Sequence, residues 1–167
     1  MSDFKKYTDY HTVLTCNALI WSEGKILLLK RAADKLVDPN LYGGVGGKVE
    51  PGESFFQSLM REVKEETGLE DFDTVRLYSV TQHPFPPTEA EWVNLYFIMT
   101  IPKIVPIPPN REGEFFWFTP EETKSLPMPS DTGKYIQILA KNPNAFIFGF
   151  FDHDNEGNTT REEIKVF

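Results

Sequence analysis

Runs of β-branched and aliphatic residues, separated by short polar turns, dominate the pattern along this chain. Residues 12–21 and 25–31 form two such runs, and the segment 22–24 between them favours a hairpin turn. Three further runs have the same character, at residues 74–81, 93–101 and 114–118. The pattern therefore predicts a protein made mostly of strands.

A helical period is clearest between Ser54 and Thr67. At about 100° per residue, one arc of this segment is apolar and is expected to pack on a core; it contains Phe55, Phe56, Leu59, Met60 and Val63. Ser54 and Gln57 have the spacing of a capping box, and Gly68 supplies a stop. The segment is therefore predicted to be an amphipathic helix.

The last third of the chain predicts two helices and a closing pair of strands. Thr119 and Pro120 are a typical N-cap and first residue of a short helix, and Asp131 is a candidate N-cap for a second helix that ends near Lys141. Residues 145–151 and 160–167 are expected to pair across a turn. The whole chain, residues 1–167, is predicted to be one domain of the α/β (α+β) class, with helices packed on a mixed β-sheet.

Composition and charge restrict the possible partners. The formal net charge is −8, so the chain is a poor candidate for binding a DNA or RNA polymer, although a free nucleotide complexed with a metal is not excluded. Cys16 is the single cysteine, so no intrachain disulfide can form. No apolar run has membrane-spanning length, and residues 1–14 lack the apolar core of a signal peptide. We expect a soluble cytoplasmic protein with no membrane partner.

The predicted helix carries three carboxylates on a second arc, Glu62, Glu65 and Glu66. Like charges at this spacing repel one another. A glycine-rich segment precedes the helix, with glycines at 43, 44, 46 and 47, and such a segment lets backbone approach a ligand closely. Clustered carboxylates near backbone carbonyls favour Mg²⁺ or Mn²⁺, which would relieve the repulsion. The alternative is a solvated acidic face with Arg61 and Lys64 nearby. His11, His83 and His153 are scattered and show no metal-ligand spacing.

Residues 47–69 resemble the Nudix box, G-x5-E-x7-R-E-U-x-E-E-x-G-U, where U is a bulky aliphatic residue. Gly47, Glu53 and Arg61 stand at its first three fixed positions, and the segment "REVKEETGL" completes it without a mismatch. The resemblance implies the Nudix α/β/α sandwich. It also implies a divalent-metal-dependent hydrolase that attacks a nucleoside diphosphate linked to another group, giving a nucleotide pyrophosphatase that uses Mg²⁺ or Mn²⁺.

The same resemblance implies roles for individual residues. Glu62, Glu65 and Glu66 would be catalytic metal ligands, joined by the carbonyl of Gly46. Glu53 would pair with Arg61 and hold the glycine-rich segment against the helix. The proton of the attacking water would pass to Glu65 or to a loop carboxylate, for which Glu112 is the candidate and would also approach the metal. From its sequence context alone, Glu112 is equally an exposed loop charge.

The substrate contacts are less determined. Lys30, Arg31 and Lys48 are candidate phosphate contacts, although the first two can equally be a strand end that reaches solvent. Outside the box the chain resembles the MutT-like branch, which hydrolyses oxidised purine triphosphates such as 8-oxo-dGTP to the monophosphate and pyrophosphate. Asp131 stands where some members contact the purine edge, and Tyr42 could flank the base.

Two departures and two alternatives keep the substrate open. Gly43 replaces an asparagine that contacts the base in some members, and Pro129 replaces a tryptophan. Pro84 follows the box at a spacing similar to that of a proline in ADP-ribose-hydrolysing Nudix enzymes, which favours an ADP-ribose or nucleotide-sugar pyrophosphatase. Some Nudix domains bind nucleotides as regulators without hydrolysing them. The oligomeric state is not predicted.

Overall fold

The computed structural model describes residues 11–86 and 90–167. Its helices are α1 (Phe55–Thr67), α2 (Pro120–Thr123) and α3 (Ser130–Lys141). Its strands are β1 (Thr12–Ser22), β2 (Lys25–Arg31), β3 (Tyr42–Gly43), β4 (Val45–Lys48), β5 (Thr74–Phe85), β6 (Ala90–Thr100), β7 (Gly113–Phe118), β8 (Ile147–His153) and β9 (Thr159–Val166). The prediction that the N-terminus lacks a signal-peptide core rests mostly on residues 1–10, which lie outside the described residues. Residues 87–89 also lie outside them.

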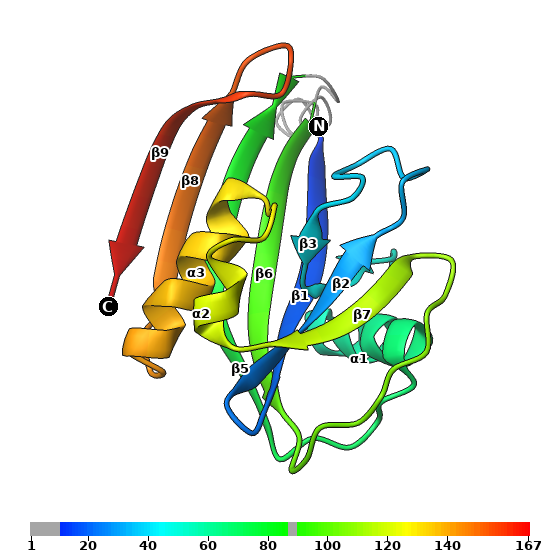
Figure 1. Cartoon of the computed structure of the whole chain (residues 1–167). Helices are drawn as coiled ribbons and strands as arrows, with labels where there is room; N and C mark the ends of the chain where they lie inside the picture. The colour runs from blue at the N-terminus through cyan, green and yellow to red at the C-terminus, as the bar shows by residue number, and fades with distance from the viewer. Residues whose placement is uncertain (1–10, 87–89) are drawn as a thin grey trace.

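The strands form one mixed sheet in the order β3-β2-β1-β6-β5-β8-β9, with β4 also paired to β1 and β7 to β2. β1 runs parallel to β6 and β5 parallel to β8, whereas the other pairs are antiparallel. α1 covers one face of the sheet, and α2 and α3 cover the other (Figure 1). The predicted fold class, a mixed sheet in an α/β/α sandwich, is confirmed. In the described residues, no helix is long and apolar enough to cross a membrane.

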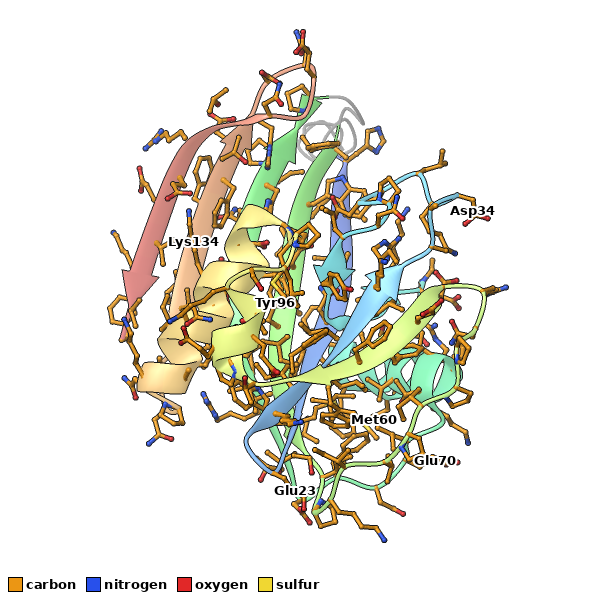
Figure 2. The ribbon with its side chains drawn as sticks, viewed as in Figure 1. Glu23, Asp34, Met60, Glu70, Tyr96 and Lys134 are labelled. Atoms are coloured by element: carbon orange, nitrogen blue, oxygen red, sulfur yellow. The ribbon has the colours of Figure 1, made fainter. Side chains whose placement is uncertain are left out.

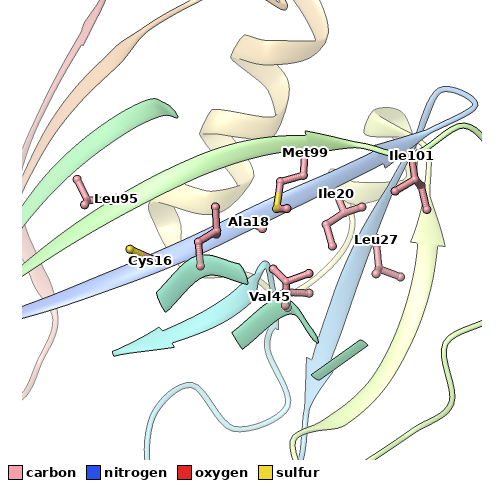
Figure 3. Packing of buried hydrophobic residues seen from close by; sticks show 10 residues of the cluster. Cys16, Ala18, Ile20, Leu27, Val45, Leu95, Met99 and Ile101 are labelled. Carbon is pink, nitrogen blue, oxygen red and sulfur yellow. The ribbon is translucent and has the colours of Figure 1, made fainter. Parts of the chain in front are cut away.

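The sheet is buried on both faces, which explains its nearly continuous apolar strands. Side chains of β1 alternate between two clusters: Cys16, Ala18 and Ile20 belong to the cluster that includes residues of α1, while Leu19 belongs to the cluster that includes residues of α3. Figure 3 shows part of the first cluster, where residues of β1, β4 and β6 meet. These two cores fix the positions of α1 and α3 on opposite sides of one rigid sheet.

α1 has the predicted ends. Ser54 Oγ accepts from the Gln57 N–H, the Gln57 side chain accepts from the Ser54 N–H, and Gly68 ends the helix in a left-handed conformation. Leu59 is buried, but the prediction that Phe55 and Phe56 pack on the core is wrong, since they are 46% and 56% exposed. Both lie in the first turn, whereas the buried residues come from the later turns.

The density of glycines predicts a loop for the glycine-rich segment, and that prediction is wrong. It forms β3 and β4, and Gly46 pairs with Asn17 of β1. A Cβ on Gly46 would lie 2.1 Å from the Cys16 carbonyl oxygen, and Gly46 has a φ of 151°. Glycine is required there because two backbones touch, independently of any ligand.

Candidate active site

A groove of about 880 Å³ opens on the sheet between α1, β4, β6 and the loop that precedes β7. Most of the residues proposed from the sequence line this groove, namely Gly46, Glu62, Glu65, Glu66, Glu112, Arg31 and Lys48. They come from parts of the chain far apart in sequence, and the shared sheet brings them together. The groove is therefore a candidate active site.

Glu66 is the most perturbed carboxylate of the groove. Burial raises its pKa to about 8, the charges of Glu62 and Glu112 add to the rise, and a hydrogen bond from the Gly46 N–H opposes it. That N–H lies 3.2 Å from Glu66 Oε2. Without a cation in the groove, Glu66 is therefore largely protonated at neutral pH. A buried acid held neutral in a groove is a frequent mark of a functional site.

Glu62 sits against the backbone of β4. A Cβ placed on Gly47 would lie 2.5 Å from the Glu62 carboxyl carbon, so glycine at this position makes room for the carboxylate. Arg61 Nη1 lies 2.7 Å from Glu62 Oε1 and 3.6 Å from Glu65 Oε2. The arginine thus compensates part of the repulsion that the three carboxylates would otherwise have.

Arg61 and Glu53 are in contact, as the sequence led us to expect. Arg61 Nε and Nη2 donate to the two oxygens of Glu53 at 2.7 and 2.9 Å, and Nη2 also lies 3.3 Å from the Lys48 carbonyl oxygen. The hydrogen bond to Arg61, followed by one from the Glu50 N–H, lowers the pKa of Glu53 to about 2. This fork ties the turn before α1 to the end of β4.

Glu112 reaches the groove from the loop before β7. Lys35 Nζ lies 2.7 Å from Glu112 Oε2 and Arg111 Nε lies 3.3 Å from Oε1, and the Lys35 contact lowers the pKa of Glu112. The loop is fastened to α1 because Asn110 Nδ2 donates to the Glu66 carbonyl oxygen at 2.7 Å. Glu112 is therefore an ionised carboxylate facing the same groove as Glu66.

The donor set suits a hard divalent cation in kind, since carboxylates and a backbone carbonyl are the oxygen ligands that Mg²⁺ prefers. Within residues 11–86 and 90–167, however, no three His, Cys, Asp or Glu side chains converge closely enough to hold an ion as they stand. Their present partners explain this, because Glu62 is turned to Arg61, Glu66 to the Gly46 N–H and Glu112 to Lys35. All three carboxylates nevertheless line one groove.

The candidate phosphate contacts divide into two groups. Arg31 and Lys48 line the groove; Arg31 Nε donates to the Val37 carbonyl oxygen, and Lys48 Nζ lies 5.1 Å from the Trp92 ring centre. Lys30 instead lies over Tyr42, with Nζ 6.0 Å from the ring centre. Two positively charged side chains, Arg31 and Lys48, therefore line the same groove as the carboxylates of α1.

The groove continues into a second cavity of about 410 Å³, and Trp92, Asn94 and Tyr96 border both. Asp131 lines this second cavity and is 4% exposed. Tyr96, which projects from β6 toward α3 (Figure 2), donates to Asp131 Oδ2 at 3.0 Å. The predicted N-cap role of Asp131 is wrong, because Pro129 occupies the cap position without a side-chain hydrogen bond. The carboxylate is instead aimed at the cavity.

Tyr42 borders a smaller cavity that Tyr96 and Arg31 also line. Its ring packs edge-on against Phe116 and Phe118, which fixes its orientation. Tyr42 is not one of the residues that line the second cavity, although Tyr96 and Pro129 border both that cavity and the smaller one.

Several groove residues were not predicted from the sequence. Thr15 Oγ1 donates to Asn94 Oδ1 at 2.7 Å, and Asn17 Nδ2 donates to Thr15 Oγ1 at 2.8 Å, so a polar ladder crosses β1 and β6. The sequence did contain a signal for these residues, because polar side chains stand at alternate positions of otherwise apolar strands and so share one face of the sheet. The view of the histidines as scattered is also wrong, since the ring centres of His83 and His153 are 5.6 Å apart.

Fold and groove together define an α/β/α protein with an acidic site built around one helix. The family model described as "NUDIX domain" matches residues 11–139. The chain therefore belongs to the Nudix family, which confirms the resemblance seen in its box. Nudix hydrolases generally use divalent metal ions.

Proteins of similar sequence are named as phosphoanhydride hydrolases, but their names give different substrates. An ADP-ribose pyrophosphatase of Methanocaldococcus jannaschii is 40% identical over 68 residues, which is 40% of this chain and 39% of that protein. The chain thus spans about two fifths of that relative. The nucleoside triphosphatase NudI of Escherichia fergusonii is 28% identical over 137 residues, 72% of this chain and 91% of that protein.

A solved structure supports the fold independently. A mutator MutT protein from Bacillus halodurans superposes with a TM-score of 0.75, covering 92% of this chain and 97% of that one. The identity is 20%, so this likeness bears on the fold alone.

Proposed function

We propose that this protein is a divalent-metal-dependent hydrolase of nucleoside diphosphate-linked compounds, and that its substrate is a purine nucleoside triphosphate such as 8-oxo-dGTP. The observation that carries the proposal is one continuous groove, with the box carboxylates at one end and the Asp131 carboxylate at the other. The triphosphate would lie at the acidic end and the base at the Asp131 end. The names of the relatives, a triphosphatase and a pyrophosphatase, agree with the reaction class.

The reaction is hydrolysis of a phosphoanhydride. Water forms a bond to phosphorus, the bond to the departing phosphate oxygen breaks, and the products are a nucleoside monophosphate and pyrophosphate. A divalent cation, when bound, would neutralise charge on the phosphate oxygens and lower the pKa of the attacking water. Glu62, Glu65, Glu66 and the Gly46 carbonyl would hold the cation.

The chain's other groups have separate tasks. Arg31 and Lys48 line the groove and would bind phosphate oxygens. Glu112, kept ionised by Lys35, would accept the proton of the water, with Glu65 as the alternative. Glu53 would act only through Arg61, by holding the end of β4 in place.

A panel of substrates tests the proposal: 8-oxo-dGTP, the ordinary nucleoside triphosphates, ADP-ribose and dinucleoside polyphosphates, each with Mg²⁺ or Mn²⁺ and with identified products. We expect the highest kcat/KM for a guanine-type triphosphate and no turnover in excess chelator. Turnover that survives chelation would overturn the proposal. Binding of nucleotides without hydrolysis of any would instead assign the chain to the regulators.

ADP-ribose is the second candidate substrate. The relative named for that activity favours it. The substrate panel separates the two candidates, and Asp131→Asn tests the base contact on which the guanine-type candidate depends, because the change exchanges a carboxylate oxygen for an NH₂ donor. The preference for guanine-type over other triphosphates should fall, with KM affected more than kcat. If the mutant and parent give the same ratios of kcat/KM, Asp131 does not contact the base.

A further inference from the structure

His83 of β5 is enclosed at the Asp131 end of the groove. Its ring stacks on Phe151 of β8, with ring centres 5.0 Å apart and an interplanar angle of 10°. Nδ1 lies 3.3 Å from His153 Nε2, and Nε2 lies 3.0 Å from Thr81 Oγ1 and 3.7 Å from Asp131 Oδ2. Each ring nitrogen therefore has a possible acceptor beside it, so the ring can hold one proton or two.

Asp131 is arranged as a hydrogen-bond acceptor. Oδ2 accepts from Tyr96, and Oδ1 accepts from the Thr132 N–H at 2.7 Å and the Thr132 hydroxyl at 3.3 Å. An ionised carboxylate has about four acceptor positions, so capacity is left for a ligand in the cavity. A guanine edge offers two adjacent N–H donors, whereas the corresponding adenine edge offers one donor and one acceptor. Asp131 therefore favours a guanine-type edge, which brings an N–H to the remaining acceptor position without setting a ring-nitrogen lone pair against the carboxylate.

Building on the proposed function, we propose that His83 is a specificity-determining residue whose protonation controls whether Asp131 can accept hydrogen bonds from the base. A neutral His83 leaves the carboxylate available. A protonated His83 pairs with the carboxylate and withdraws it from a guanine-type edge. The preference for guanine over adenine should then be largest near neutral pH and should fall in mild acid.

The groups around His83 set the direction of this effect. Burial lowers the pKa of His83, the charge of Asp131 opposes that change, and His153 adds to it. Since its pKa is lowered, His83 is in its neutral form near pH 7. Tyr96 faces it from β6, and because burial raises the pKa of Tyr96 well above 10, this phenol does not titrate.

Asp38 is an acidic group of the same cavity whose titration must be separated from that of His83. It lines the same cavity from the loop after β2, and burial raises its pKa, with Arg31 opposing and Asp131 adding to the rise. An Asp38→Asn variant removes its titration while leaving His83 in place. If His83 is responsible, this variant keeps the acid-induced loss of guanine preference.

Binding to the metal-free full chain tests the proposal without requiring hydrolysis. GMP and AMP are titrated at about pH 7.5 and about pH 5.5, on either side of the ordinary histidine range, with tryptophan fluorescence as the signal. We expect the parent to bind GMP about tenfold more tightly than AMP at the higher pH and to lose this preference at the lower pH. By linkage, a tenfold change in GMP affinity corresponds to a shift of about one unit in the pKa of His83. His83→Gln and His83→Phe should keep the preference at both values.

His11→Gln is the matched control, because His11 is exposed and should behave as the parent does. If the acid-induced loss persists in both His83 variants, or if the parent shows no guanine preference at either pH, the proposal is overturned. Hydrolysis bears on it separately: an inactive chain whose GMP preference behaves as described would refute the proposed function and leave the role of His83 standing.

Proton NMR of the parent protects the test against a variant that fails to fold. The chain has three histidines, so their ring signals are few. Linkage is reciprocal, so a tenfold dependence of GMP affinity on protonation requires GMP to lower the pKa of His83 by about one unit. AMP should lower it less. A His83 pKa that does not move at saturating GMP contradicts the proposal.

Discussion

At the scale of single residues, the groove depends on carboxylates in unusual surroundings. Glu66 is half-buried and has a raised pKa, whereas Glu112 is ionised beside Lys35. Two carboxyl groups of the same chemical type can therefore differ in protonation at the same pH, and so in function, because their surroundings differ. Their effect on activity can therefore be separated from their effect on stability.

Glu66→Gln should lower turnover by orders of magnitude while the fold survives. Glutamine can accept the same hydrogen bond from the Gly46 N–H, and its amide needs no desolvation of a charge. It cannot replace the ionised carboxylate that a cation requires. Steady-state kinetics with thermal melting checks both effects. Glu70→Gln is the control, since Glu70 is exposed and paired with Lys64 outside the groove, and a fully active Glu66→Gln would contradict the assignment.

Cys16 should resist alkylation in the folded protein. Its side chain is buried, and burial, together with the charges of Glu53 and Glu62, raises its thiol pKa to about 11. Because the thiolate is the reactive form, little reagent should be consumed near neutral pH. Intact-mass analysis after iodoacetamide should show an unmodified folded chain and a fully modified chain in urea. Equal rates in the two states would refute the burial.

At the scale of elements, α1 is fixed at two places along its length. Its start is fixed by the capping box, and its middle is held to β4 by Arg61. These contacts fix the position of Glu62, Glu65 and Glu66 relative to the sheet.

Arg61→Ala should lower both the melting temperature and the turnover. The change leaves Glu53 without the partner that keeps its pKa low and also releases the Lys48 carbonyl. We expect a drop of a few degrees, since about 1 kcal/mol corresponds to about 2–4 °C for a chain of this size. A double-mutant cycle with Glu53→Gln isolates the pair. If the two changes add independently, the pair does not act as a unit.

The sequence could predict α1 because its signals are local: the period, the capping box and Gly68 lie within a few turns of one another. β3 and β4 could not be predicted, since they are short, glycine-rich and defined by pairing with β1 and β2. The His83–His153 contact joins residues 70 positions apart, so no local pattern announces it. The resemblance assigned Asp131 to the base, which stays a prediction, whereas its local context suggested a helix cap that does not form.

At the scale of the whole molecule, the acidic groove couples proton and metal binding to stability. The pKa of Glu66 is about 8 in the folded chain against an ordinary value of 4.5. Between these values the folded chain binds more protons than the unfolded chain, so metal-free stability should fall as the pH rises through the window. Mg²⁺ binds the ionised form, so its stabilising effect should grow over the same range.

Melting temperatures in chelator and in excess Mg²⁺, measured from about pH 7 to about pH 9, check this coupling. The range avoids titration of His83, whose lowered pKa produces the opposite slope in acid. The difference between the two curves should widen with pH in the parent and lose most of that widening in Glu66→Gln. A constant difference in the parent would show that Glu66 does not release a proton to the metal.

The pairing of β1 has a consequence for the order in which the protein can assemble. β1 pairs with β2 and β4, which follow it closely, but also with β6, and Thr15 bonds Asn94 across 79 positions of sequence. Joining such distant segments requires a large loop to close first, which slows folding. A nascent chain that has emerged only as far as Leu69 thus carries the complete box yet has no groove. The carboxylates acquire their setting only after β6 has docked beside β1, so the site matures late in folding.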